Sequence, residues 1–456
     1  MKEYTEDDIK HLDQIIKDKD VDSIRRELDD LHPADVAELY QQLELDDAEY
    51  LFSLLDEETA ADVLMELDED DRLKLISDMP AEEIAKQIDH LDTDDAVDLI
   101  QQLDQEERDE ILSHIDDVEQ AGDIIDLLKY DEDTAGGLMG TEMIVVNENW
   151  SMPECIKQMR LQAEDMDEIY YVYVVDNDDK LKGTFPLKLM LTHPSVSKIK
   201  HVMEVDPVSV RAETPIDEVA LDFEKYDLVA MPVVDSIGRL LGRITVDDVM
   251  DHVRESSERD YQLASGISSD VDADDTVLAQ TKARIPWLLI GIGSGLLASV
   301  ILGTFEAQLQ AVTALALFIP IIGGTGGNVG VQASAIVVQG LANGSLDVKE
   351  FGKQLGKEVL IGLLNATIMS LVVFIYNLIT LPGEFAVTIS VAVSLFIVVM
   401  FATLLGTTIP LTLEKIHINP ALATGPFIQI SNDIVGLIIY VNISTMFLRM
   451  LTDVAI

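Results

Sequence analysis

The sequence contains a single cysteine among 456 residues, Cys155, and only 31 Lys and Arg against 84 Asp and Glu. One cysteine excludes an internal disulfide framework, and scattered histidines exclude a Cys/His zinc site. A net charge of −53 disfavours anionic partners, nucleic acids above all. The sequence also lacks a Walker-type phosphate-binding loop and a nucleophile elbow. We therefore expect neither an enzyme nor a nucleic-acid-binding protein.

The acidic residues are concentrated in the first part of the chain. Residues 1–283 hold 76 acids and 25 bases, whereas residues 284–456 hold eight and six. The N-terminus, MKEYTEDDIK, is polar and lacks the apolar stretch of a signal peptide. Together with the length, this predicts a multidomain chain whose acidic first part attracts cations.

The second part consists of long apolar runs. We predict five membrane spans, each long enough to cross the roughly 30 Å hydrocarbon core of a bilayer. They cover about 285–304, 311–342, 359–381, 385–411 and 420–451. A buried soluble helical domain is the alternative, but these runs are too long and too poor in charge for it. The lipid bilayer is thus an expected partner.

Basic residues orient the predicted spans. They precede span one and lie between spans two and three and between spans four and five: Lys282, Arg284, Lys349, Lys353, Lys357 and Lys415. The other two loops, FEAQLQ and LPGEF, contain no base. Because Lys and Arg accumulate on the cytoplasmic side, we expect a cytoplasmic N-terminal part and a C-terminus outside.

Short amphipathic units repeat through residues 5–130. Examples are HPADVAELYQQL, DEETAADVLMEL, PAEEIAKQI, TDDAVDLIQQL and QEERDEILSHI. Each opens with Pro, Asp or Thr or an acidic turn, and apolar residues then recur every three or four positions. This pattern predicts capped helices of an all-α repeat domain, assigned to residues 1–135.

Two copies of one α+β unit follow, assigned to residues 136–200 and 201–254. Val174-Val175-Asp176 aligns with Val233-Val234-Asp235, and Gly183 aligns with Gly242, each pair 59 positions apart. The helix, strand, Asp-rich turn, strand and helix of each copy resemble a tandem pair of CBS domains. The resemblance implies ATP as a candidate ligand of the pair, although no residue here establishes it.

Residues 255–283 join the second copy to span one and are predicted to be a connecting, or plug, helix. A plain linker is the alternative. The membrane domain is then residues 284–456, with five helices.

The whole chain resembles the MgtE family of magnesium channels. The resemblance rests on YDEDTAGGLM before the first CBS copy, on IPIIGGTGGNVGVQASAIV in span two and on NPALATGPFIQISNDIVGLIIY in span five. It implies a homodimer in the bacterial inner membrane, cytosolic Mg²⁺ sensing, and a pore lined mainly by spans two and five. Asn419 departs from the family, which commonly has Asp there. Loss of that charge is expected to weaken ion capture at the cytoplasmic end.

Asp433 is the main candidate metal ligand of the membrane domain. It lies in a long apolar span with no base nearby, where a carboxylate is costly unless it faces water or a cation. A protonated structural Asp is the alternative. The resemblance matches Asp433 to the family's pore aspartate, and two copies facing one hydrated Mg²⁺ suit a hard cation.

Span two is interrupted by the glycine-rich run at 323–327. We expect unwound backbone there, with Thr325 and Asn328 meeting the waters of an ion, and Gly425 and Pro426 are expected to break span five in the same way. Close packing of helices on small residues is the alternative for the glycines.

Most cytosolic acids are expected to be solvated surface residues. By position in the family motifs, eight are candidate ligands for regulatory Mg²⁺ across domain interfaces: Asp95, Asp98, Asp217, Asp227, Asp248, Glu255, Glu258 and Asp260. Like charges at such an interface repel one another, and a bridging Mg²⁺ reverses the sign.

These patterns favour a Mg²⁺ channel that imports the ion down its gradient and closes when cytosolic Mg²⁺ binds. Two alternatives are a membrane sensor of Mg²⁺ or nucleotide that does not conduct, and an exporter of Mg²⁺, Co²⁺ or Ni²⁺. Asp433 argues against the pure sensor, which has no use for a charge at membrane depth.

Overall fold

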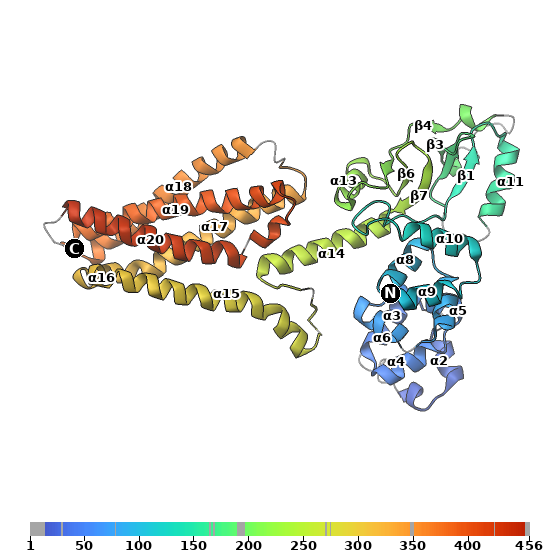
Figure 1. Cartoon of the computed structure of the whole chain (residues 1–456), viewed down its shortest axis with the longest axis horizontal. Helices are drawn as coiled ribbons and strands as arrows, with labels where there is room; N and C mark the ends of the chain where they lie inside the picture. The colour runs from blue at the N-terminus through green and yellow to red at the C-terminus, as the bar shows by residue number, and fades with distance from the viewer. Residues whose placement is uncertain are drawn as a thin grey trace. The chain divides into compact units, whose positions relative to one another are not determined.

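The computed structural model divides the chain into two units, Met1–His252 and Val253–Ile456 (Figure 1). It describes residues 14–28, 31–77, 79–163, 166, 169–188, 197–269, 271–273, 275–346, 351–423 and 425–451. Residues 1–13 of the predicted repeat domain, and Lys349 of the orientation argument, lie outside the described residues.

The first unit begins with short helices. They are α2 (Val21–Leu28), α3 (Pro33–Gln42), α4 (Leu45–Phe52), α5 (Glu57–Glu66), α6 (Glu69–Ser77), α7 (Ala81–Ile88), α8 (Thr93–Gln101), α9 (Gln105–Leu112) and α10 (Val118–Leu127). The five predicted repeats are confirmed as α3, α5, α7, α8 and α9. Asp56 caps α5 by accepting the Thr59 N–H at 3.1 Å, and Asp104 forms a capping box at α9.

The two CBS-like copies have matching sheets. The first contains β1 (Ile144–Asn147), α11 (Met152–Gln162), β2 (Val172–Val175), β3 (Leu181–Phe185), the 3₁₀ turn η1 (Ile199–His201) and β4 (Glu204–Val205), with sheet order β1-β2-β3-β4. The second contains β5 (Val210–Arg211), α13 (Ile216–Tyr226), β6 (Ala230–Val234) and β7 (Leu240–Thr245), with sheet order β5-β6-β7.

The repeat seen in the sequence is exact in register. Gly183 pairs with Val174 and Gly242 pairs with Val233, and each hairpin has a bulge at the same place. The turns match as well, because Asp176 and Asp235 each accept two backbone N–H groups of their own turn. These bonds explain why an Asp directly follows the first strand of each hairpin.

The connecting helix differs from its predicted bounds. One helix, α14 (Val246–Ser265), contains both the end of the second CBS copy and the start of the connector. It begins in the first unit and ends in the second. Gly266 follows with φ +80°, and α15 starts at Val277, so 266–276 is not helical where it is described.

The second unit contains the five predicted spans. They are α15 (Val277–Thr304), η2 with α17 (Thr313–Phe318, Ile319–Ala342), α18 (Phe351–Thr380), α19 (Phe385–Lys415) and α20 (Gly425–Leu451), together with the short α16 (Glu306–Ala311) and η4 (Pro420–Ala423). All five are long and apolar enough to cross a membrane. The helix α19 packs against α17, α18 and α20, and its Leu395 and Val398 are buried at the centre.

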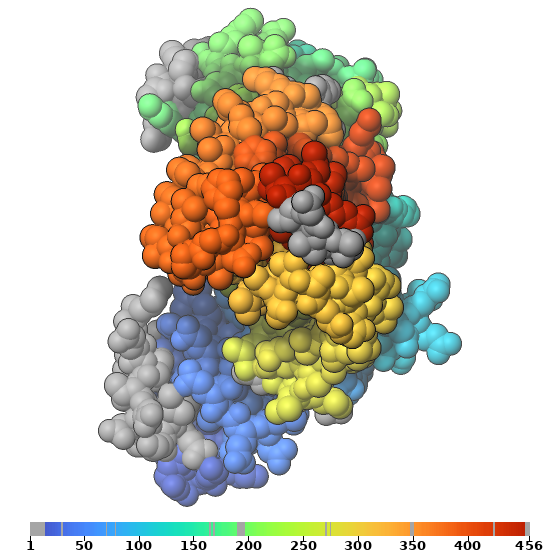
Figure 2. Space-filling model, turned by 90° about the vertical axis from the view of Figure 1, so that its left-hand side faces the viewer, coloured from blue at the N-terminus to red at the C-terminus, as the bar shows by residue number. Residues whose placement is uncertain are grey.

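The helix α15 lies at the edge of this bundle. It contacts α20, and its most apolar stretch contributes no buried residue within the chain. Figure 2 looks onto the end of the bundle where α16 (yellow) lies in front and the end of α20 (red) lies next to it.

The expected interruption of span two is wrong. The helix α17 runs unbroken from Ile319 to Ala342, through the whole glycine run. The glycines serve close packing instead: a Cβ on Gly326 would meet Val398 at 3.0 Å, and a Cβ on Gly406 of α19 would overlap the Gly330 carbonyl. Gly425 and Pro426 begin α20, after the 3₁₀ turn η4 that ends at Ala423, and the helix then runs through Asp433 to Leu451 without the interruption expected near that residue.

Candidate functional site

The glycine face of α17 packs against the polar residues of α20. A Cβ on Gly323 would lie 3.3 Å from the Asp433 Oδ1, and a Cβ on Gly327 would lie 3.3 Å from Gln429 Cγ. A side chain at position 323 would press on the Asp433 carboxylate, which lies close beside α17. Spans two and five, the expected pore-lining spans, therefore contact each other beside Asp433 within one chain.

The second polar contact between these helices is Asn432. This side chain is 1% exposed, and a Cβ on Gly330 would overlap its Nδ2. It lies beside Asp433 in sequence but is turned into the helix crossing, whereas Asp433 is half-buried. Sequence inspection missed Asn432 because an amide next to an acid has no distinguishing pattern.

A polar stripe continues outward on the surface of the second unit. Asn328 and Gln332 of α17 are exposed, as is Gln429 of α20, and Thr325 is half-buried. The predicted ligands Thr325 and Asn328 therefore lie on a helix face that the chain itself does not fully cover. Amides exposed along helices of such apolarity require water or a protein partner.

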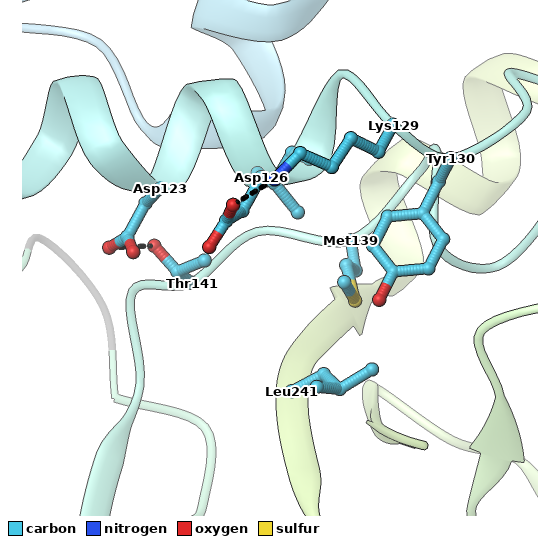
Figure 3. A pocket seen from close by; sticks show the side chains of 8 residues that line it. Asp123, Asp126, Lys129, Tyr130, Met139, Thr141 and Leu241 are labelled. Atoms are coloured by element: carbon cyan, nitrogen blue, oxygen red, sulfur yellow. Dashed lines mark hydrogen bonds and ion pairs between the residues drawn. The ribbon is translucent and has the colours of Figure 1, made fainter. Parts of the chain in front are cut away.

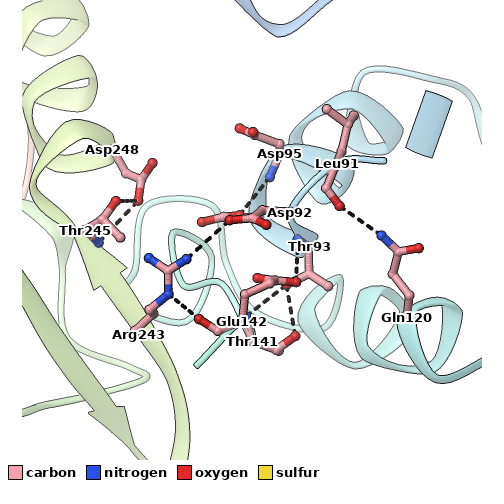
Figure 4. A network of polar contacts seen from close by, with 11 residues as sticks. Leu91, Asp92, Thr93, Asp95, Gln120, Thr141, Glu142, Arg243, Thr245 and Asp248 are labelled. Atoms are coloured by element: carbon pink, nitrogen blue, oxygen red, sulfur yellow. Dashed lines mark hydrogen bonds and ion pairs between the residues drawn. The ribbon is translucent and has the colours of Figure 1, made fainter. Parts of the chain in front are cut away.

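A cluster of carboxylates occupies the first unit. Oxygens of Asp92, Asp94 and Glu142 lie within 4.8 Å of one another. Asp92 and Asp94 flank the start of α8. Glu142 comes from the segment before β1 and lies beside Thr93 (Figure 4). Carboxylate oxygens at this spacing match the ligands that Mg²⁺ and Ca²⁺ prefer.

The segment that carries Glu142 is held against β7. Gly140 exchanges two backbone hydrogen bonds of 2.9 Å with Arg243, and a Cβ on Gly242 would lie 2.5 Å from the Gly140 carbonyl oxygen. A Cβ on Gly140 would lie 2.8 Å from Asp94 Oδ2 and 3.0 Å from Glu142 Oε2. Two glycines thus allow the carboxylates to converge.

Glu142 also caps α8 from outside the helix. Its Oε1 accepts the Thr93 N–H at 3.0 Å and its Oε2 accepts the Thr93 hydroxyl at 3.1 Å. Asp92 occupies the N-cap position of α8, but its carboxylate pairs with Arg243 at 3.2 Å. Arg243 also donates to the Glu142 carbonyl oxygen (Figure 4). One guanidinium therefore ties the N-cap of α8 to the segment preceding β1.

The predicted ligands Asp95 and Asp248 lie next to this cluster. Burial, followed by the charge of Asp248, raises the pKa of Asp95 to about 7. Burial raises the pKa of Asp94 well above its ordinary value, with Asp248 the next cause. Burial also raises the pKa of Asp248, against the hydrogen bonds that it accepts from Thr245. A bound cation would stabilise the ionised form of all three carboxylates.

The other predicted acids lie outside this group. Asp98 is exposed one turn after Asp95, Asp217 faces His252 at 3.7 Å, and Asp227 ends α13 in the left-handed conformation.

Three more of the predicted acids lie on α14, and of these Glu255 and Glu258 are exposed. The half-buried Asp260 accepts a hydrogen bond of 2.8 Å from Asn419.

A hollow of about 450 Å³ adjoins the cluster, between α10 and β7 (Figure 3). Asp123 and Asp126 lie along one wall, and Tyr130, Met139 and Leu241 lie along another. Thr141 connects the two places: its hydroxyl donates to Asp123 at 3.3 Å, and its N–H donates to the Thr93 hydroxyl at 2.9 Å.

The stability of the first unit is expected to depend on pH in the absence of divalent cations. The folded pKa of Asp95, about 7, lies above its ordinary 3.8, so folding favours the protonated form. This contribution is complete below pH 4 and is lost as pH rises through about 7. Denaturant unfolding of the full chain in detergent between pH 4 and 8 measures it. Mg²⁺ should flatten the decline, and an equal decline in Mg²⁺ and EDTA would contradict cation binding here.

Comparisons with known proteins cover both units. A family model described as "Divalent cation transporter" (MgtE) matches residues 319–443, and one described as "MgtE intracellular N domain" matches residues 31–133. The CBS domain model matches residues 135–192 and 199–255.

Curated relatives include the magnesium transporter MgtE of Thermus thermophilus, 36% identical over 330 residues, or 71% of this chain and 72% of that protein. MgtE of Enterococcus faecalis is 31% identical over 334 residues, 73% of each chain.

Among solved structures, the cytosolic domain of the Mg²⁺ channel MgtE in complex with ATP is similar. It is 30% identical with a TM-score of 0.51, and the match covers 54% of this chain and 99% of that one. The soluble part of a magnesium transporter is 29% identical with a TM-score of 0.50, and the match covers 55% of this chain and 98% of that one.

Proposed function

The chain belongs to the MgtE family of magnesium transporters, and on this premise we propose that it is a channel that admits Mg²⁺ and closes when cytosolic Mg²⁺ binds its first unit. The observation that carries the proposal is the position of Asp433. Its carboxylate lies beside Gly323 in an apolar helix bundle. A negative charge at membrane depth is costly, and binding of a cation that crosses the membrane offsets this cost.

The polar stripe supports a homodimer with the pathway between its copies. Asn328, Gln332 and Gln429 are exposed on the protomer, and lipid would leave their amides without hydrogen-bond partners. A second copy facing this stripe would enclose a polar, hydrated path and bring two Asp433 carboxylates to it. Mg²⁺ loses its water reluctantly, so amides and carboxylates that contact its hydration shell suit it as a substrate.

The membrane potential supplies the driving force. A doubly charged ion gains about 4.6 kcal/mol per 100 mV when it enters a negative interior. The basic loop residues orient the first unit toward the cytoplasm, and with five spans the C-terminus is outside. We assign the chain to the plasma membrane of a bacterium on this basis.

The carboxylate cluster supports regulation by cytosolic Mg²⁺. Asp92, Asp94 and Glu142 would hold the ion, and Asp95 and Asp248 add negative charge beside it. These residues come from α8, from the segment before β1 and from the start of α14. A cation neutralises their mutual repulsion and would draw the helical domain and the second CBS copy together. If several such ions act together, we expect channel closure to depend steeply on the Mg²⁺ concentration. ATP at the CBS pair remains a prediction, supported by the ATP complex of the relative.

Reconstitution tests the proposal. Full-length protein in liposomes that contain a Mg²⁺-sensitive dye is given an imposed potential, negative inside. We expect Mg²⁺ entry that accelerates with the potential and slows when Mg²⁺ is also present on the face of the first unit. Empty liposomes and a reversed potential are the controls.

Each alternative predicts a different result in this assay. Absence of flux at either sign of potential would indicate a sensor that does not conduct. Flux that is insensitive to the potential, or that requires a counter-ion, would indicate an exchanger and overturn the channel.

A further inference from the structure

A side-chain hydrogen bond joins the connecting helix to the loop before α20. The Asn419 Nδ2 donates to the Asp260 Oδ1 at 2.8 Å, and 159 positions separate the two residues in sequence. Both residues belong to the second unit, Val253–Ile456. Asn419 directly precedes η4, the 3₁₀ turn that leads into α20.

The orientation of the Asn419 amide is determined by a second bond. Its Oδ1 accepts the Ala421 N–H at 2.8 Å, which leaves the NH₂ group facing Asp260. The opposite orientation would place two oxygens together at Asp260 and two N–H groups together at Ala421. An NH₂ group donates hydrogen bonds and does not ligate a cation, so this contact satisfies the Asp260 carboxylate without one.

Backbone packing brings the same two segments together. Gly425 has φ +20°, and a Cβ there would overlap the Ala264 carbonyl oxygen at the end of α14. Gly266 has φ +80°, and a Cβ there would lie 2.6 Å from Pro426 Cγ. The end of α14 therefore rests on the first residues of α20, the helix that carries Asp433 about two turns further on.

We infer that Asn419 is a positioning residue that holds the end of α14 on the start of the pore helix without a cation. The inference rests on the proposed function, because it assigns the pathway to α20. Cytosolic Mg²⁺ bound elsewhere then adds to a contact that already exists in its absence. A carboxylate at 419 would instead face Asp260 with like charge and would require a bridging divalent cation.

Spin-label distances test this inference without any transport measurement. Labels at Ser257→Cys on α14 and Leu422→Cys in η4 are introduced into full-length protein in nanodiscs, since both positions are exposed. The buried Cys155 is replaced by Ala, and dilution with unlabelled chain removes distances between copies. The variants are Asn419→Asp, Asp260→Asn and the exchange of both, each in EDTA and in Mg²⁺.

In EDTA the parent protein should show one narrow distribution of label-to-label distances. Asn419→Asp should reduce the population at that distance by about tenfold. Mg²⁺ should restore it in Asn419→Asp and change little in the parent. The variant with both residues exchanged should show a narrow distance distribution in EDTA, because an amide and a carboxylate again face each other.

Two results would overturn the inference: a parent distribution that is broad in EDTA and narrows only in Mg²⁺, or an Asn419→Asp variant that is as narrow as the parent in EDTA. Neither requires flux, so the inference fails separately from the proposed channel.

Discussion

Asp433→Asn is expected to lower Mg²⁺ flux by about a hundredfold while the protein remains folded. A charge at membrane depth is worth about 3 kcal/mol on insertion scales, and 1.4 kcal/mol corresponds to a factor of ten. The amide keeps the shape beside Gly323 and removes only the attraction for the cation. Initial rates of Mg²⁺ entry into liposomes at a fixed potential measure the effect.

Glu306→Gln is the matched control for this substitution. Glu306 is an exposed acid on α16, hydrogen-bonded to Gln310 at 2.9 Å, and is expected to lie near the membrane interface. Its neutralisation should leave the flux within about twofold, since exposed charges are screened by salt. Parent-like flux through Asp433→Asn, with the protein folded, would remove Asp433 from the pathway.

Asp95→Asn should stabilise the first unit in EDTA and weaken its response to Mg²⁺. The raised pKa of Asp95, about 7 instead of 3.8, means that its ionised form is disfavoured by about 4 kcal/mol at high pH. Because the acids of the cluster share this repulsion, we expect a gain of roughly 2 kcal/mol at pH 8. Denaturant unfolding in EDTA and in Mg²⁺ measures both changes.

Asp109→Asn provides the comparison, because Asp109 lies on the next helix, α9, and is exposed. It should change stability by less than about 0.5 kcal/mol. KCl at the ionic strength of the Mg²⁺ solution is a second control, since K⁺ screens charges and does not bridge carboxylates. Equal stabilisation of the parent by KCl and Mg²⁺ would show that these acids act by screening alone.

The same substitution connects the cluster to the channel. Cytosolic Mg²⁺ should inhibit flux through Asp95→Asn only at higher concentration than in the parent, whereas Asp109→Asn should behave as the parent does. A higher inhibitory Mg²⁺ concentration for both variants would indicate a general effect of charge on the first unit.

The prediction for the glycine run of α17 failed for a physical reason. Glycine lowers helix propensity, so several glycines in one span favour an interruption. Propensity is a weak preference, however, and a tightly packed bundle overrides it. Gly326 and Gly330 sit where α19 or α20 approaches too closely for a side chain. Only the neighbouring helices distinguish a packing glycine from a hinge.

The family motifs point to acids beside the carboxylate cluster and not to the cluster itself. Asp95 and Asp248 were identified from the family motifs, and both lie at the cluster. Asp92, Asp94 and Glu142 were missed, because acids are frequent throughout residues 1–283 and none of these three stands out. Their convergence depends on Gly140 and Gly242 allowing one segment to lie against β7.

The sequence by itself determined the properties that depend on local pattern. Apolar runs long enough to cross the hydrocarbon core of a bilayer identified the five spans. Apolar residues at every third or fourth position identified the helical repeats, and a separation of 59 residues identified the duplicated hairpins. The tertiary structure alone decided which polar groups meet. Whether Asn419 faces Asp260, or Glu142 reaches Thr93, depends on contacts between segments far apart in the chain. Such contacts are selected by packing and by hydrogen-bond geometry, and neither leaves a periodic trace in the sequence.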